Sequence, residues 1–403
     1  MTSDTGDELL LIALGAVLVL GPATKHLCHR LRVPVAVGYI LLGLILGSVV
    51  DIAAGASTER FEHAFSVLAQ LGVVALLFRV GLTSHTSALL AKLPDASVIW
   101  IGNVLGTFVV GYLVSRYALG WTLETSLVVG TAFSATSIAI SLSVWDELGL
   151  AGSDTGVMLL DVAELDDLSA ALILAVLLGS LPTLLNGEDG FWQLAGTASA
   201  AVLFKLVLFV TGCYLFAHFL EARFTAFNRR MSDTPASLTI SILGAGLAIA
   251  AVADALGFSV AIGALFAGLA FSRDPEAVRN TGSFTYFYEF LTPFFFIHVG
   301  MQTDVGALIQ AADVGLVLFL AAALSKFAFT LMPALLSMSP QDAARLGVSM
   351  IPRAEIALVV IYECLAIDER IVPPEVFAGM ILVVLATSVF APVALRRLLV
   401  SAR

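Results

Sequence analysis

Four carboxylates fall within seven consecutive residues of an otherwise apolar stretch, residues 157–178. They are Asp161, Glu164, Asp166 and Asp167. A carboxylate at the centre of a bilayer costs about 2.5–3.5 kcal/mol on insertion scales, so such groups persist where they face a cavity, a partner or a travelling cation. If the stretch crosses a membrane, it predicts a function in cation binding.

On a helix these acids would lie on two different faces, because successive residues advance by about 100° around the helix axis. Glu164 and Asp167 share a face that Asp161 extends, whereas Asp166 is turned away from Asp167. The pair can therefore address two partners, one in a cavity and one on a neighbouring helix. Close carboxylates titrate in separate steps, and oxygen ligands suit hard cations. The pattern favours exchange of protons for a metal cation; the alternative is a structural buried acid pair.

A lysine lies near the middle of another apolar segment. Lys326 follows Ala-Ala-Ala-Leu-Ser and precedes Phe-Ala-Phe. A lysine in this position needs a buried acid, and Asp166 or Asp167 is the candidate. The alternative is that its long side chain reaches the membrane interface.

Two further apolar segments contain polar groups that can interrupt a helix. One carries hydroxyls, including Thr136 and Ser137, and the other carries Pro352 followed by Arg353 and Glu355. Proline removes a backbone hydrogen bond, and discontinuous helices at the bilayer midplane coordinate ions in secondary transporters. Their positions in opposite halves of the chain favour an inverted repeat. Helix packing through hydroxyls is the alternative for the first cluster.

The elements that must position these residues are membrane helices. Hydrophobic residues make up 59% of the 403 and charged residues only 13%, too apolar for a soluble domain of this length. Stretches of about 20 apolar residues are long enough to span the hydrocarbon core. We expect an all-α polytopic membrane protein with about thirteen transmembrane helices, of which the two short ones at 34–50 and 257–272 are tilted or broken. The segments are 8–24, 34–50, 65–82, 95–117, 123–145, 154–180, 191–220, 235–254, 257–272, 286–302, 313–337, 341–366 and 374–399.

The basic residues between these segments predict the orientation, because cytoplasmic loops are enriched in Lys and Arg. One side carries Lys25, Arg30, Arg32, Lys92, Arg223, Arg229, Arg230, Arg273, Arg279, Arg345, Arg396, Arg397 and Arg403, and the other carries Arg60, Arg116 and Arg370. This asymmetry places the N-terminus outside and the C-terminus in the cytoplasm of a cell (inner) membrane.

Together these motifs resemble monovalent cation/proton antiporters of the second branch (CPA2), of the NapA type. The resemblance rests on Thr136-Ser137, on Asp166-Asp167 one helix later, on Lys326 and on Pro352-Arg353-Ala-Glu355. It also includes Pro293-Phe-Phe-Phe-Ile-His-Val-Gly-Met, and it extends from about residue 34 to 395.

The resemblance implies an NhaA/NapA-like fold in which two discontinuous helices cross. It implies that Asp167 binds the cation and the proton directly near Thr136 and Ser137, and that Asp166 pairs with Lys326. That ion pair is associated with electrogenic exchange of two protons per sodium ion. Na⁺ is the expected cation, with Li⁺ or K⁺ as alternatives, and a homodimer in membrane lipid is implied.

The same resemblance implies one exchanger domain over 1–403 without a cytosolic regulatory domain. Dimer-forming helices are expected in parts of 8–82 and 191–302, and a mobile core that holds the ion in about 95–180 and 313–399. Three features depart from the family pattern: the extra acids Asp161 and Glu164, and Arg79 in an apolar segment. Arg79 either pairs with an extra acid or reaches the cytoplasmic interface.

Other functions have less support in the sequence. An electroneutral or K⁺-selective antiporter and a related cation channel or uniporter remain alternatives, although channels more commonly use symmetric rings or carbonyl filters. An intramembrane aspartyl protease needs its two acids on separate helices with a Gly-x-Gly-Asp sequence, which is absent. We therefore expect no enzyme, and no pattern predicts a cofactor or a nucleic-acid partner.

Overall fold

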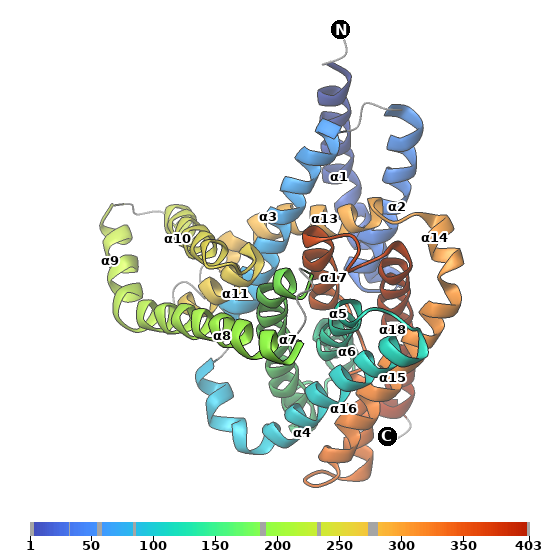
Figure 1. The fold of residues 1–403 in the computed structure, drawn as a ribbon. Helices are drawn as coiled ribbons and strands as arrows, with labels where there is room; N and C mark the ends of the chain where they lie inside the picture. The colour runs from blue at the N-terminus through green and yellow to red at the C-terminus, as the bar shows by residue number, and fades with distance from the viewer. Residues whose placement is uncertain are drawn as a thin grey trace. The chain divides into compact units, whose positions relative to one another are not determined.

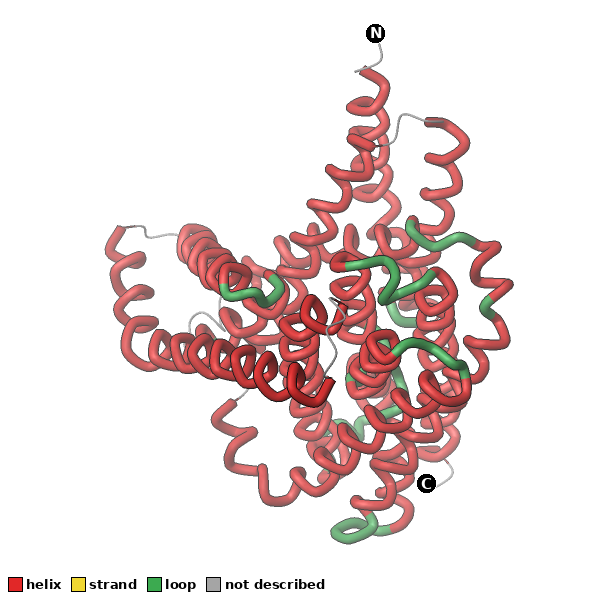
Figure 2. The backbone as a smooth tube through the Cα atoms, in the orientation of Figure 1, coloured by secondary structure: helices red, strands yellow, loops and turns green. Residues whose placement is uncertain are grey.

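The computed structural model describes residues 4–31, 33–54, 59–83, 86–185, 191–231, 235–272 and 281–400, and regular structure in these ranges is helical (Figure 2). Of the basic residues that predict the orientation, Arg32, Arg273, Arg279 and Arg403 lie outside the described residues.

The helices (Figure 1) are α1 (Asp4–Leu31), α2 (Val35–Ala54), α3 (Glu59–Thr83), α4 (Thr86–Leu113), the π-helix η1 (Val114–Ala118), α5 (Leu123–Ser134), α6 (Ile138–Glu147), α7 (Asp154–Leu185), α8 (Phe191–Leu215), the π-helix η2 (Phe216–Leu220), α9 (Glu221–Met231), α10 (Pro235–Ala255), α11 (Val260–Phe271), α13 (Thr281–Met301), α14 (Val305–Gln310), α15 (Ala312–Ala334), α16 (Pro340–Ser349), α17 (Glu355–Ile367) and α18 (Pro374–Val400).

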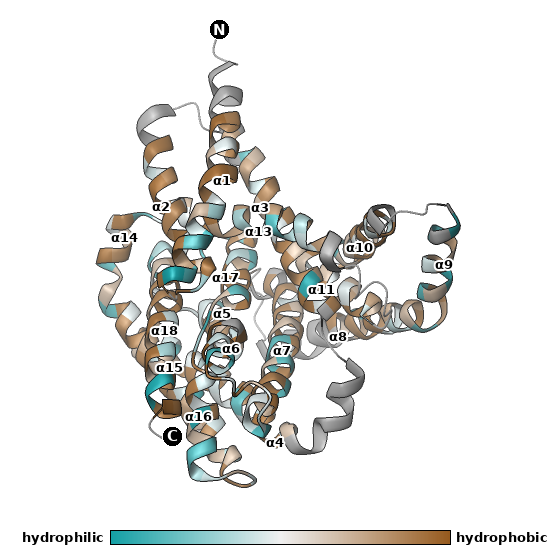
Figure 3. Cartoon of the chain, turned by 180° about the vertical axis from the view of Figure 1, so that it is seen from behind, coloured by the Kyte–Doolittle hydropathy of each residue, from teal (hydrophilic) through white to brown (hydrophobic). Residues whose placement is uncertain are grey.

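Apolar residues cover most of these helices, as the brown ribbon of α15 and α18 shows in Figure 3. Seven helices in the described ranges are long and apolar enough to cross a membrane, and α2 and α11 contain shorter apolar stretches. The expected segments 123–145 and 341–366 are each divided into two helices, α5–α6 and α16–α17. The segment 154–180 is continuous in α7, whose carboxylates interrupt its apolar character.

The chain divides into two compact units. Unit 1 comprises residues 1–22, 45–87 and 175–300. Within it α11 packs on α3 and α10. The backbones of α3 and α11 approach closely because they meet at Gly81 and Gly268, where a Cβ would collide with the backbone of the other helix. Phe78, Leu82 and Phe271 belong to the apolar cluster of this unit.

Unit 2 comprises residues 23–44, 88–174 and 301–403. Here α15 packs on α16 and α18, while α5 packs on α17 and α6 contacts α16 and α18. Its apolar cluster includes Trp145, Leu159 and Met350, all buried. Apart from 175–180, the ranges expected to hold the cation fall within this unit; the expected roles of the two parts, as dimer interface and as mobile core, stay predictions.

Two unwound stretches lie side by side in unit 2. Residues 135–137 separate α5 from α6, and residues 350–354 separate α16 from α17; Figure 2 shows both as loops. The Ser137 N–H donates to the Pro352 carbonyl over 2.9 Å, so the two stretches are joined through their backbones. Pro352 cannot donate a hydrogen bond and disfavours helical geometry in the residue before it. A hydrogen bond of 3.1 Å from the Arg353 N–H to Thr387 Oγ1 on α18 satisfies a donor that the break leaves open.

Candidate functional site

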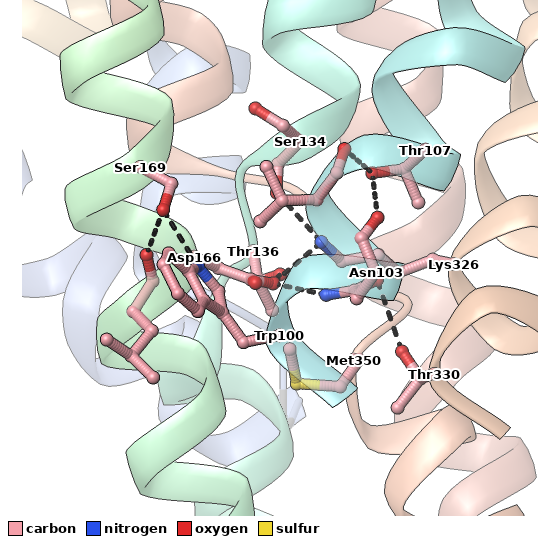
Figure 4. A network of polar contacts seen from close by, with 12 residues as sticks. Trp100, Asn103, Thr107, Ser134, Thr136, Asp166, Ser169, Lys326, Thr330 and Met350 are labelled. Atoms are coloured by element: carbon pink, nitrogen blue, oxygen red, sulfur yellow. Dashed lines mark hydrogen bonds and ion pairs between the residues drawn. The ribbon is translucent and has the colours of Figure 1, made fainter. Parts of the chain in front are cut away.

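One oxygen of Asp166 is the centre of a buried polar network (Figure 4). Its Oδ2 accepts hydrogen bonds from Asn103 Nδ2 over 2.6 Å and from Thr136 Oγ1 over 2.7 Å. Lys326 Nζ lies 2.7 Å from the same atom. The three donors come from α4, from the break after α5 and from α15. Within the described part of the chain, Asp166 Oδ1 is buried without a hydrogen-bond partner.

Lys326 joins this network to the first break. It is fully buried, and its Nζ donates to the Ser134 carbonyl over 2.8 Å besides binding Asp166. Ser134 is the last residue of α5, and carbonyls at helix C-termini carry partial negative charge and lack intrahelical partners. The ion pair with Asp166 that the resemblance implied is therefore present, and the lysine also neutralises a helix end.

The second break has a buried cation of its own. Arg353 is 0% exposed, and its Nη1 lies 3.3–3.5 Å from the carbonyls of Met350, Ile351 and Pro352, next to the C-terminus of α16. Its Nε and Nη2 have no hydrogen-bond partner among the described residues. The C-terminal ends of both interrupted helices thus carry a positive side chain, which favours that end of the helix dipole.

The second aspartate faces the crossing of the two breaks. The backbone of Thr136 hydrogen-bonds to the Asp167 carboxylate, and Glu355 is close enough to repel it electrostatically. Ser137 Oγ donates to Glu355 Oε2 over 3.1 Å. Asp167 Oδ1 is buried and, within the described residues, has no hydrogen-bond partner. A free carboxylate oxygen beside hydroxyl oxygens and unwound backbone provides oxygen ligands that suit a hard monovalent cation.

Comparison with known proteins assigns the family. The family described as "Sodium/hydrogen exchanger, transmembrane" matches residues 15–401. The chain belongs to this family. It is a multi-pass membrane protein, a monovalent cation/proton antiporter and not an enzyme.

Individual exchangers match over most of their length. The chain is 28% identical to the high-affinity Na⁺/H⁺ antiporter NhaS3 of Synechocystis over 369 residues, which cover 89% of this chain and 77% of that protein. It is 25% identical to an Na⁺/H⁺ antiporter of Enterococcus hirae, over 94% of this chain and 95% of the other. The structure of the antiporter MjNhaP1 from Methanocaldococcus jannaschii superimposes with a TM-score of 0.66 at 18% identity, covering 97% and 96% of the two chains, and thus shares the fold.

The extra acids of this exchanger lie on the same helix as the aspartate pair. Asp161 and Glu164 precede Asp166 on α7 and are half-buried, and the three donors to Asp166 Oδ2 come from α4, from the break after α5 and from α15. Arg79, in unit 1, stacks on Tyr288, with its guanidinium carbon 4.0 Å from the ring centroid. This cation–π contact is an additional environment of Arg79, and the two environments expected from the sequence stay predictions.

Sequence reasoning missed the uncharged side chains that α4 and α15 contribute to the exchanger's network. Asn103 donates to Asp166 and accepts a hydrogen bond of 3.2 Å from Thr330 Oγ1 on α15. Trp100 Nε1 donates to Ser169 Oγ over 2.8 Å and joins α4 to α7. The one available signal was an amide inside the apolar segment 95–117, a weaker sign of function than a charge.

Proposed function

We propose that this chain exchanges protons for Na⁺ at Asp167, electrogenically and by alternating access, with Li⁺ or K⁺ as the alternative cation. The observation that carries the proposal is the division of labour within the aspartate pair. Asp166 is engaged by Lys326, while Asp167 presents an unpartnered buried oxygen at the crossing of two interrupted helices. One acid is thus tied to a counter-charge and the other is open to an ion.

The proposed cycle couples the two aspartates. Cation binding at Asp167, with help from the Thr136–Ser137 backbone and hydroxyls, displaces a proton. Protonation of Asp166 removes the charge that holds Lys326, and loss of that proton restores the ion pair. A site loaded with either substrate carries less net charge than an empty one, and the cost of moving charge through a low-dielectric barrier therefore favours movement of the loaded site. Asp161, Glu164, Arg353 and Glu355 support the site electrostatically.

The wider architecture belongs to the same proposal. We place thirteen transmembrane helices in two inverted repeats of the NapA type, with the breaks 135–137 and 350–354 in equivalent positions. The two interrupted helices are the recurring device for midplane ion sites in transporters. The helices of unit 1 form a homodimer, and the core of unit 2 carries the ion between membrane faces. The N-terminus lies outside and the C-terminus in the cytoplasm.

The direct test is transient current from purified protein in liposomes under jumps of Na⁺, Li⁺ and K⁺. We expect a Na⁺- or Li⁺-dependent current that Asp167→Ala and Asp167→Asn abolish, because the oxygen that binds the ion is lost or neutralised. Retention of full exchange in both variants would refute Asp167 as the binding residue.

A second variant tests the coupling separately. Lys326→Gln removes the counter-charge of Asp166, so cation-driven proton flux continues while the current falls. An unchanged current in this variant contradicts the role of the ion pair in charge movement. Proton flux without current in the wild type identifies electroneutral exchange, in which case the family assignment is unaffected.

A further inference from the structure

Asp166 is held unevenly by its neighbours. All three of its donors converge on Oδ2, at 2.6–2.7 Å, and Oδ1 has no partner in the described ranges. A carboxylate offers about four lone-pair directions across its two oxygens. Three donors on one oxygen therefore fix the orientation of the carboxylate and leave the other oxygen for a proton.

Of the three donors, Asn103 has neither a charge nor a place at the cation. Lys326 has to separate from Asp166 in the proposed cycle, and Thr136 lies at the break that also hydrogen-bonds to Asp167. Asn103 comes from α4 and is fully buried, and its hydrogen bond is the shortest of the three that reach Asp166 Oδ2. It can hold Oδ2 in every state of the site.

The orientation of the Asn103 amide is set by another helix. Its Oδ1 accepts from Thr330 Oγ1, so its Nδ2 faces Asp166. Thr330 follows Lys326 by four residues, about one turn of α15. The amide thus connects Asp166 on α7 to the helix that carries its counter-charge (Figure 4).

From this geometry we propose that Asn103 is a positioning residue of the exchanger, which keeps the Asp166 carboxylate aligned with Lys326 through each protonation cycle. Thr330 acts only through Asn103, by fixing its amide. The inference rests on the proposed function in one respect, the release and return of Lys326. It assigns no cation contact to Asn103, so its loss slows turnover without weakening cation binding.

The experiment measures Na⁺-driven proton flux in liposomes as maximal rate and as the Na⁺ concentration for half-maximal rate. Asn103→Leu lowers the maximal rate at least about tenfold, which corresponds to ~1.4 kcal/mol and is near the lower end for a hydrogen bond to a charged group. The half-maximal Na⁺ concentration stays within about twofold. Thr107→Val is the matched control, because the Thr107 hydroxyl bonds only to carbonyls of its own helix α4 in the described network, and its rate stays unchanged.

Thr330 provides a test that leaves Asn103 intact. Thr330→Val lowers the maximal rate, and Thr330→Ser, which keeps the hydroxyl, restores it. In the double variant Asn103→Leu/Thr330→Val the rate equals that of Asn103→Leu alone, because Thr330 acts through the amide. If Asn103→Leu fails to fold, the comparison of Thr330→Val with Thr330→Ser decides.

A wild-type rate in Asn103→Leu or in Thr330→Val overturns the inference. So does a double variant whose loss of rate is the product of the two single losses. A rise in the half-maximal Na⁺ concentration of Asn103→Leu by as large a factor as the fall in its maximal rate also overturns it. Asp167→Ala is measured alongside. A silent Asp167→Ala with a fully active Asn103→Leu refutes only the role of Asn103, whereas an active Asp167→Ala refutes the proposed cation site.

Discussion

At the scale of single residues, the exchanger keeps opposite charges where no water reaches them. Asp166 and Lys326 are both 0% exposed. Removing one member of such a pair strands the other charge and costs about 3–5 kcal/mol, whereas removing both can be nearly neutral. The ion pair therefore contributes less to the free energy of unfolding than removal of one of its members would indicate.

Stability measurements can separate these two quantities. We expect Lys326→Met to lower the free energy of unfolding by about 3–5 kcal/mol, because Asp166 is left without its counter-charge. Asp166→Asn/Lys326→Met recovers most of that loss, because no unpaired charge remains. Thermal unfolding of the purified variants in detergent gives the measurement. A double variant as unstable as Lys326→Met would show that the cost comes from packing around the lysine and not from the stranded charge.

The charged residues of the site and the hydroxyls of the first break could be found from the sequence, whereas Asn103 and Thr330 could not. Charges inside apolar segments are rare, so Asp166, Lys326 and Arg353 are conspicuous in a linear chain. Asn103 and Thr330 are ordinary in a membrane helix, where polar side chains commonly join neighbours. Their importance depends on α4, α7 and α15 meeting at one point, which no local pattern encodes.

At the scale of elements, the two breaks have different local causes. Pro352 accompanies the second break, but 135–137 contains no proline, and α18 continues past Pro392. What the two breaks share is tertiary hydrogen bonding of the freed backbone, through Ser137 N–H, Ser134 carbonyl and Arg353 N–H. The sequence could therefore place the breaks approximately, while their geometry comes from contacts between distant segments.

A neighbouring pair of hydroxyls on α18 tests this dependence. Thr387→Val removes the acceptor of the Arg353 N–H, and we expect a loss of about 1–3 kcal/mol in unfolding free energy, the cost of a buried donor left unsatisfied. Ser388→Ala is the control, because Ser388 Oγ is buried and has no hydrogen-bond partner in the described residues. Chemical or thermal unfolding compares the two. Equal losses would mean that the second break does not rely on Thr387.

At the scale of the whole molecule, the predicted orientation places the start of α16 and the end of α17 on opposite sides of the membrane. The connection to α18 contains Arg370, whose side chain is 82% exposed, and the first turn of α16 contains Gln341, which is also exposed. The asymmetry of basic residues puts Arg370 outside and the start of α16 in the cytoplasm.

Labelling from one side of the membrane checks this orientation. In intact cells we expect a membrane-impermeant maleimide to modify Arg370→Cys, and to modify Gln341→Cys only after the membrane is opened. The native Cys28, Cys213 and Cys364 are buried and give a low background. The opposite pattern of labelling would invert the predicted topology.

In the proposed site, the side-chain cations at the two helix ends also bear on the valence of the transported ion. Among the groups that interact directly at the crossing, Asp166, Asp167 and Glu355 carry three formal negative charges and Lys326 and Arg353 carry two positive ones, a sum of −1 without the more distant Asp161 and Glu164 of α7. One monovalent ion brings that sum to zero, whereas a divalent ion would leave an excess positive charge in a medium where uncompensated charge is costly. In the proposed site, discrimination against calcium and magnesium thus arises from Lys326 and Arg353, two side chains to which no contact with the ion is assigned.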